Sequence, residues 1–97
     1  MLVKMGVDIS RLERPIRRAL NTIENAYRER GEEAVITSTY EGAHSAGSLH
    51  YCNLAVDIRD PKKDRSQVAQ ILRFGLGGKY DVVEEKNHIH IEYDPLP

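Results

Sequence analysis

Residues 54–59 constrain the fold of this chain most strongly. Their even-numbered positions are all apolar and would share one face of a strand, while Asp57 and Arg59 fall on the other face. A carboxylate inside an otherwise apolar strand is costly to bury unless it is paired or bound to a metal ion. This segment therefore predicts both a β-strand and a polar or metal site on one face of that strand.

Two helices are predicted on either side of this strand. Apolar residues three and four positions apart indicate an amphipathic helix over residues 12–27, with Ser10 and Glu13 at capping-box spacing. A shorter helix is predicted over residues 64–76, with Asp64 as its N-cap. Its apolar side is expected to comprise Val68, Ile71, Leu72 and Phe74.

Three further strands complete the predicted elements. β-branched residues favour a strand over residues 33–40, and residues 80–84 and 88–93 are expected to form a hairpin around a tight turn. Residues 41–53 lack a regular period and are interpreted as a loop. The order α, β, β, α, β, β predicts an α+β fold, a small mainly antiparallel sheet with two helices packed on it.

Length and charge exclude several classes of protein. Ninety-seven residues leave room for one hydrophobic core, so a single domain over residues 1–97 is expected. A net charge of -1 gives no excess of positive charge for binding nucleic acid or an anionic membrane. No apolar run is long enough to span a membrane. No signal peptide is recognised, so cytoplasmic synthesis is expected. The single cysteine, Cys52, excludes an intramolecular disulfide.

All four histidines fall in two short segments. His44 and His50 lie in the predicted loop before the strand that carries Asp57, and His88 and His90 lie two positions apart on the last strand. That spacing places the last two on the same side of the sheet. Two imidazoles and a carboxylate around an open fourth position are typical of a catalytic zinc site, and nitrogen ligands favour zinc over magnesium.

Several alternatives stay open on the residues alone. Two histidines on a strand are often only a polar outer face, although a nearby Glu84 favours the metal hypothesis. Glu84 is expected to face the histidines across the turn. Glu85 has Glu-x-x-His spacing to His88 and is a rival general base, but strand alternation is taken to favour Glu84. Cys52 is a minor alternative zinc ligand.

The segment from Ser48 to Asp57, followed by Glu84 and the His-Ile-His of residues 88–90, closely resembles the zinc peptidases of the M15 family. These are the D-alanyl-D-alanine carboxypeptidase-like enzymes, with the pattern Ser-x-His, six residues, Asp, and a distant His-x-His. The same core is similar to the amino-terminal domain of hedgehog proteins, which keeps the zinc site. The resemblance covers about residues 34–93.

The resemblance implies roles residue by residue. The implied zinc ligands are His50, Asp57 and His90. The implied catalytic residues are Glu84 as base, His88 beside the metal and His44 as a further histidine. Ser48 matches the serine that opens the motif and is a candidate substrate-binding residue, although a hydrogen bond to the loop backbone is an alternative. Arg59 shares a strand face with Asp57 and could hold a substrate carboxylate, or form a surface ion pair.

Two positions depart from the family pattern. Asn53 stands where the family usually has glycine, and asparagine tolerates the left-handed conformation that such a turn requires. The peptidases often carry an arginine shortly after the first core strand, where this chain has Ser38, Thr39, Tyr40 and Glu41. The second difference argues against a strict dipeptidase-like specificity.

These observations predict a zinc-dependent carboxypeptidase or endopeptidase that cleaves peptidoglycan peptides at a bond involving a D-amino acid. Zinc would lower the pKa of a bound water to about 7 and polarise the scissile carbonyl, and Glu84 would accept the proton. The expected partner is a peptidoglycan peptide, with no nucleic acid or membrane, and the expected state is a monomer. A phage-type lytic enzyme acting at the bacterial cell wall is expected. The alternative is a non-catalytic, hedgehog-like zinc-binding interaction module.

Overall fold

The computed structural model describes residues 1–40 and 52–95 of the chain. The elements in these residues are, in order, β1 (Leu2–Val3), α1 (Arg14–Arg28), β2 (Val35–Ser38), β3 (Ala55–Arg59), α2 (Arg65–Leu76), β4 (Tyr80–Glu84) and β5 (His88–Tyr93). Five strands form one sheet in the order β1-β2-β3-β5-β4. The β1–β2 pair is parallel and the other pairs are antiparallel, which confirms the predicted α+β fold with a mainly antiparallel sheet.

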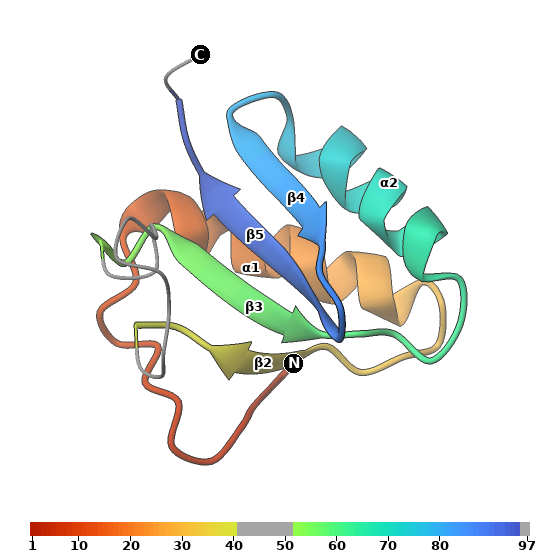
Figure 1. Ribbon diagram of the computed structural model, residues 1–97, viewed down its shortest axis with the longest axis horizontal. Helices are drawn as coiled ribbons and strands as arrows, with labels where there is room; N and C mark the ends of the chain where they lie inside the picture. The colour runs from red at the N-terminus through yellow and green to blue at the C-terminus, as the bar shows by residue number, and fades with distance from the viewer. Residues whose placement is uncertain (41–51, 96–97) are drawn as a thin grey trace.

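Both helices lie on the same side of the sheet, with α1 passing behind β3 and β5 in Figure 1. Ile16 and Ile23 of α1 and Leu72 of α2 are fully buried in the core. The sheet contributes the following buried residues to the same core: Ile36, Val56, Ile58, Val82, Ile89 and Ile91. The helices therefore cover one face of the sheet, and the apolar residues that alternate along the strands are buried beneath them.

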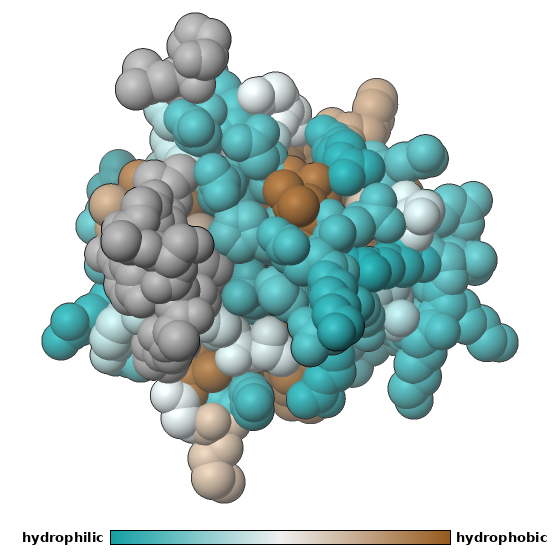
Figure 2. All heavy atoms as spheres, viewed as in Figure 1, coloured by the Kyte–Doolittle hydropathy of each residue, from teal (hydrophilic) through white to brown (hydrophobic). Residues whose placement is uncertain are grey.

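The other face of the sheet is mostly polar, with the exposed Val83 of β4 as an apolar exception beside His90. Because Ile89 and Ile91 point into the core, the residues that alternate with them on β5, His88, His90 and Glu92, point to the other side. We call this side uncovered because neither α1 nor α2 lies on it. Figure 2 views the molecule from this side, and the surface is mostly hydrophilic. The central strands β3 and β5 thus present their polar residues on a surface supported by a packed core.

The ends of α1 differ from the prediction in one respect. The helix begins at Arg14 with Glu13 as N-cap and Pro15 in its first turn, and no side chain caps it. Ser10 is therefore wrong as the cap. Its backbone N–H instead donates to Asp8 Oδ1 at 2.8 Å, so it belongs to the preceding turn.

Helix α2 ends at Leu76, as predicted, but its N-cap and one residue of its expected apolar side depart from the prediction. Asp64 is the N-cap residue, but it has a left-handed backbone and makes no capping hydrogen bond, and its carboxylate accepts a bond from Arg30 at 2.9 Å instead. Phe74 was expected on the apolar side but is 93% exposed. It lies two positions after buried Leu72, which is about 200° around the helix.

The short strand β1 was not predicted, because two residues are too few to show a period. Its backbone N–H at Leu2 donates to the carbonyl of Ala34 at 2.9 Å, which extends the sheet beyond β2. Among residues 1–40 and 52–95, neither helix is long and apolar enough to cross a membrane.

Candidate metal centre

Asp57 and His90 face each other at the centre of the sheet. They are Cα partners in the antiparallel pair of β3 and β5, so their side chains leave the sheet on the same face. His90 Nδ1 lies 3.0 Å from Asp57 Oδ1. The fold therefore brings a carboxylate and an imidazole from distant parts of the sequence into direct contact.

His88, two residues before His90 on β5, also lies close to Asp57. Its Nε2 lies 3.5 Å from Asp57 Oδ1, while its Nδ1 lies 2.8 Å from Asn87 Oδ1. The side chain of His88 is 30% exposed, compared with 12% for His90. Of the two histidines, His90 is thus the deeper and closer partner of Asp57.

The carboxylate of Asp57 is buried, with the residue only 6% exposed. Such a group is stable in a protein only when charges or donors compensate it, and the two imidazoles supply these. Burial of the His90 ring acts to lower its pKa, but hydrogen bonds to Asp57 and Glu92 and their negative charges outweigh burial and raise the pKa above 6.5. The two neighbouring carboxylates therefore favour the protonated form of His90.

The sequence reasoning missed Glu92. Its Oε1 lies 2.7 Å from His90 Nε2, so both ring nitrogens of His90 contact carboxylates. Glu92 lies two residues after His90, and the same alternation that paired the two histidines places it on their face. Alternation was therefore the signal that could have found it.

Glu84 is not brought together with this group. It pairs with core residue Ile89 across the β4–β5 hairpin, so its side chain points to the face that the helices cover. There its carboxylate accepts a hydrogen bond from Ser66 at 3.1 Å and lies 3.7 Å from Arg73 Nη2, and both of these residues are in α2. Its assignment as general base stays a prediction.

Glu85 is the residue that directly follows the end of β4. Its backbone N–H donates to the carbonyl of His88 at 2.9 Å, so the two residues face each other beside the turn. Arg65 of α2 donates to the carbonyl oxygens of both residues. Strand alternation from Glu84 then directs Glu85 to the face of the histidines.

The remaining predicted residues have different positions. Arg59 is the Cα partner of His88 and shares the face of Asp57. Asn53 has a φ of 59°, which confirms the left-handed conformation expected of it. Cys52 is a free, exposed thiol. The predicted residues His44, Ser48 and His50 lie outside the described residues.

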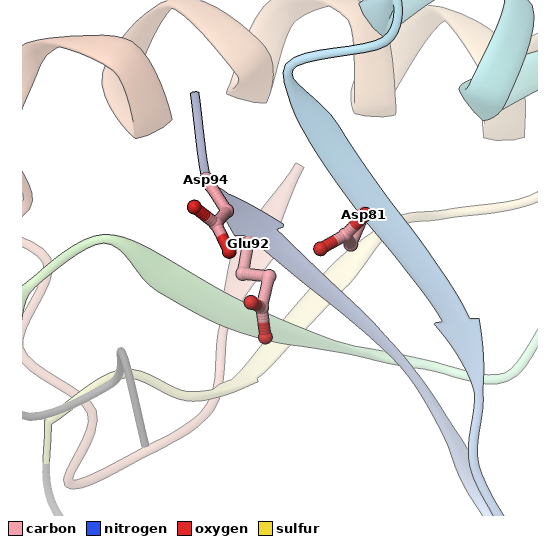
Figure 3. Close-up of side chains that lie close together, drawn as sticks. All are labelled: Asp81, Glu92 and Asp94. Carbon is pink, nitrogen blue, oxygen red and sulfur yellow. The ribbon is translucent and has the colours of Figure 1, made fainter. Parts of the chain in front are cut away.

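A cluster of three carboxylates adjoins the histidines. Ligand oxygens of Asp81, Glu92 and Asp94 lie within 4.8 Å of one another, and Figure 3 shows Asp81 on β4 facing Glu92 on β5 and Asp94 just after the end of β5. An all-oxygen set favours magnesium or calcium over zinc. Exposed acidic groups are nevertheless common without a metal ion, and Glu92 already accepts a hydrogen bond from His90.

The donor chemistry at Asp57 fits zinc. A buried carboxylate oxygen lies beside an imidazole nitrogen of His90, and these are two of the ligand types that zinc takes in catalytic sites. The observed register of β3 and β5 sets Asp57 opposite His90, so the strand pairing itself brings the carboxylate oxygen and the imidazole nitrogen together.

Comparisons with known proteins agree with this chemistry. A family model described as Peptidase M15 matches residues 2–92 of the chain. Indian hedgehog B protein from Danio rerio is 38% identical over 52 residues, which are 52% of this chain and 13% of that protein. No solved structure matches the chain.

Proposed function

The chain belongs to the peptidase M15 family, and on that premise we propose that it is a zinc-dependent peptidase that cleaves peptidoglycan peptides. The observation that carries the proposal is the contact between Asp57 and His90, a buried carboxylate and an imidazole 3.0 Å apart on the uncovered face of the sheet. His50 is proposed as the third ligand. The peptidoglycan substrate and the D-amino-acid bond rest on the resemblance to the family.

The residues around Asp57 have distinct proposed tasks. Zinc, when bound, acidifies a water molecule and polarises a scissile carbonyl. Asp57 and His90 hold the metal, and His88 is exposed enough to donate a hydrogen bond from Nε2 to a substrate oxygen. Arg59, opposite His88 on the same face, is proposed to hold a substrate carboxylate.

The general base is proposed to come from the acidic pair at the end of β4. The resemblance assigns it to Glu84, but that carboxylate is held by Ser66 and Arg73 on the helix side. Glu85 lies opposite His88, and alternation directs it to the face of the metal residues. The geometry therefore favours Glu85, and the two glutamates are a matched pair for an experiment.

The test measures zinc content and the release of peptides or amino acids from purified peptidoglycan. Wild type, Glu84→Gln and Glu85→Gln are compared, with chelator-stripped wild type as the metal-free control. We expect equal zinc in all three proteins and a loss of about 100-fold or more in activity for Glu85→Gln alone. A selective loss in Glu84→Gln would instead assign the base to Glu84.

A second candidate function has one observation in its favour. The carboxylate of Glu84, the base that the resemblance implies, contacts α2 rather than Asp57 or His90. A hedgehog-like zinc-binding interaction module would need no base. If the wild type binds zinc but releases nothing from peptidoglycan, the peptidase proposal fails and this module is the better hypothesis. Absence of zinc at neutral pH would overturn both.

The location and assembly state are proposed from the sequence alone. We propose that the protein acts as a monomer at the bacterial cell wall, in the manner of a phage-type lytic enzyme. Gel filtration together with binding to intact peptidoglycan tests both statements.

A further inference from the structure

The two ring nitrogens of His90 contact two carboxylates from different strands. Nδ1 lies 3.0 Å from Asp57 Oδ1 on β3, and Nε2 lies 2.7 Å from Glu92 Oε1 on β5 itself. Asp57 is a proposed zinc ligand, so the nitrogen beside it, Nδ1, is the one near the proposed metal position. Nε2 is on the opposite side of the ring, within hydrogen-bond distance of Glu92.

An imidazole that binds a metal through one nitrogen carries a proton on the other. A hydrogen bond from that N–H to a carboxylate fixes the tautomer and the orientation of the ring, and it makes the ligand nitrogen a better electron donor. We infer that Glu92 is a positioning residue of the metal centre, which accepts the Nε2 proton of His90 and so presents Nδ1 as the ligand atom. This role rests on the proposed function only for the presence of zinc.

The surroundings of Glu92 favour this contact. Its side chain is 23% exposed, and its Cα partners are Asp81 on β4 and Ala55 on β3. Ligand oxygens of Asp81 and Asp94 lie within 4.8 Å of a Glu92 oxygen. Figure 3 shows the three side chains grouped together. These like charges make an N–H donor the favoured partner of the Glu92 carboxylate.

The experiment compares three variants, Glu92→Ala, Glu92→Gln and Asp81→Asn. Asp81→Asn is the matched control, because it removes one negative charge from the same cluster but pairs with Glu92 rather than with His90. Zinc affinity is measured by competition with a chelator, using Zn²⁺ alone as the probe. Nitrogen-15 shifts of the His90 ring in the zinc-loaded protein report which nitrogen binds zinc and which carries the proton.

We expect zinc affinity to fall by about 10- to 100-fold in Glu92→Ala. We also expect that Nδ1 of His90 is no longer the zinc-binding nitrogen in every molecule of this variant. Glu92→Gln keeps an oxygen that accepts the Nε2 proton, so it should retain the wild-type tautomer and recover part of the affinity. Asp81→Asn should change the affinity by less than about threefold. Circular dichroism of each metal-free variant checks that the fold is intact.

The outcomes separate this role from the proposed function. If Asp81→Asn weakens zinc binding as much as Glu92→Ala does, the effect is one of net charge and the positioning role is overturned. Unchanged affinity and an unchanged His90 tautomer in Glu92→Ala would also overturn it. A wild-type protein that binds no zinc overturns the proposed metal centre itself, and this shows before any variant is made.

Discussion

Neighbouring residues on β3 and β5 lie on opposite faces of one sheet, and the two faces have different roles. Ile58 and Ile89 pair on the covered face, where both are fully buried. One position along each strand, Asp57 and His90 pair on the uncovered face. The backbone that sets the spacing of the two isoleucines also sets the spacing of the two polar residues. Packing on the apolar face thus stabilises the sheet and fixes the register of the two strands. That register sets the positions of the residues on the polar face.

The largest expected effect comes from the polar face. Asp57→Asn keeps the shape of the side chain but replaces a charged ligand with a neutral amide. We expect zinc affinity to fall by about 1000-fold or more, which is about 4 kcal/mol, with a much smaller change in the stability of the metal-free protein. Chelator competition and urea denaturation of the metal-free protein measure the two quantities. A metal-free protein that unfolds would show that Asp57 is needed for the fold and would break the comparison.

The next effect comes from the covered face, one residue along the same strand. Ile58→Ala leaves a cavity beneath the sheet, and we expect it to cost about 3 kcal/mol in the free energy of unfolding. Urea denaturation of the metal-free protein is again the measurement. Ile58→Val is the control, with an expected cost of about 1 kcal/mol. Equal costs for the two variants would show that the core around Ile58 can collapse into the space.

Tyr27 connects α1 to the end of β3, and its substitution should have an intermediate effect. Its ring is buried in the core, and its hydroxyl donates to the carbonyl of Arg59 at the end of β3, at 2.6 Å. Burial raises the pKa of Tyr27 well above its usual value, so the hydroxyl keeps its proton and remains a donor. Tyr27→Phe should cost about 1 kcal/mol in unfolding free energy. A zinc affinity that also falls would show that this bond helps to hold β3 for the metal centre.

The alternation of residues within single strands was predicted more successfully than the pairing of one strand with another. It placed Asp57 on the polar face of β3 and the two histidines together on β5, and the bounds of β4 and β5 agree with the hairpin predicted. Alternation leaves the pairing between strands undetermined. Glu84 was favoured over Glu85 as a neighbour of the histidines, in part on strand alternation. That use of alternation was wrong, because the partner of Glu84 in the observed register is the core residue Ile89.

Other differences have local causes. Ser10 has the spacing of a helix cap, but a turn with Asp8 uses it, and Glu92 has no distinctive motif although it contacts His90. Phe74 differs for a geometric reason. It is apolar and follows three residues with helical spacing, but its angular position on α2 turns it away from the sheet. Hydrophobicity alone was therefore a poor guide at this position.

Phe74 is accordingly the position with the smallest expected effect. Its side chain is 93% exposed, so Phe74→Ser removes little buried apolar surface and should change the free energy of unfolding by less than about 0.5 kcal/mol. Leu72→Ala is the matched control on the same helix, because Leu72 is fully buried and its truncation should cost about 3 kcal/mol. Urea denaturation of both variants measures the difference. A cost above about 1 kcal/mol for Phe74→Ser would mean that this ring is packed in solution, as its hydrophobicity predicted. The covered side of the molecule would then extend further around α2 than the exposure of Phe74 indicates.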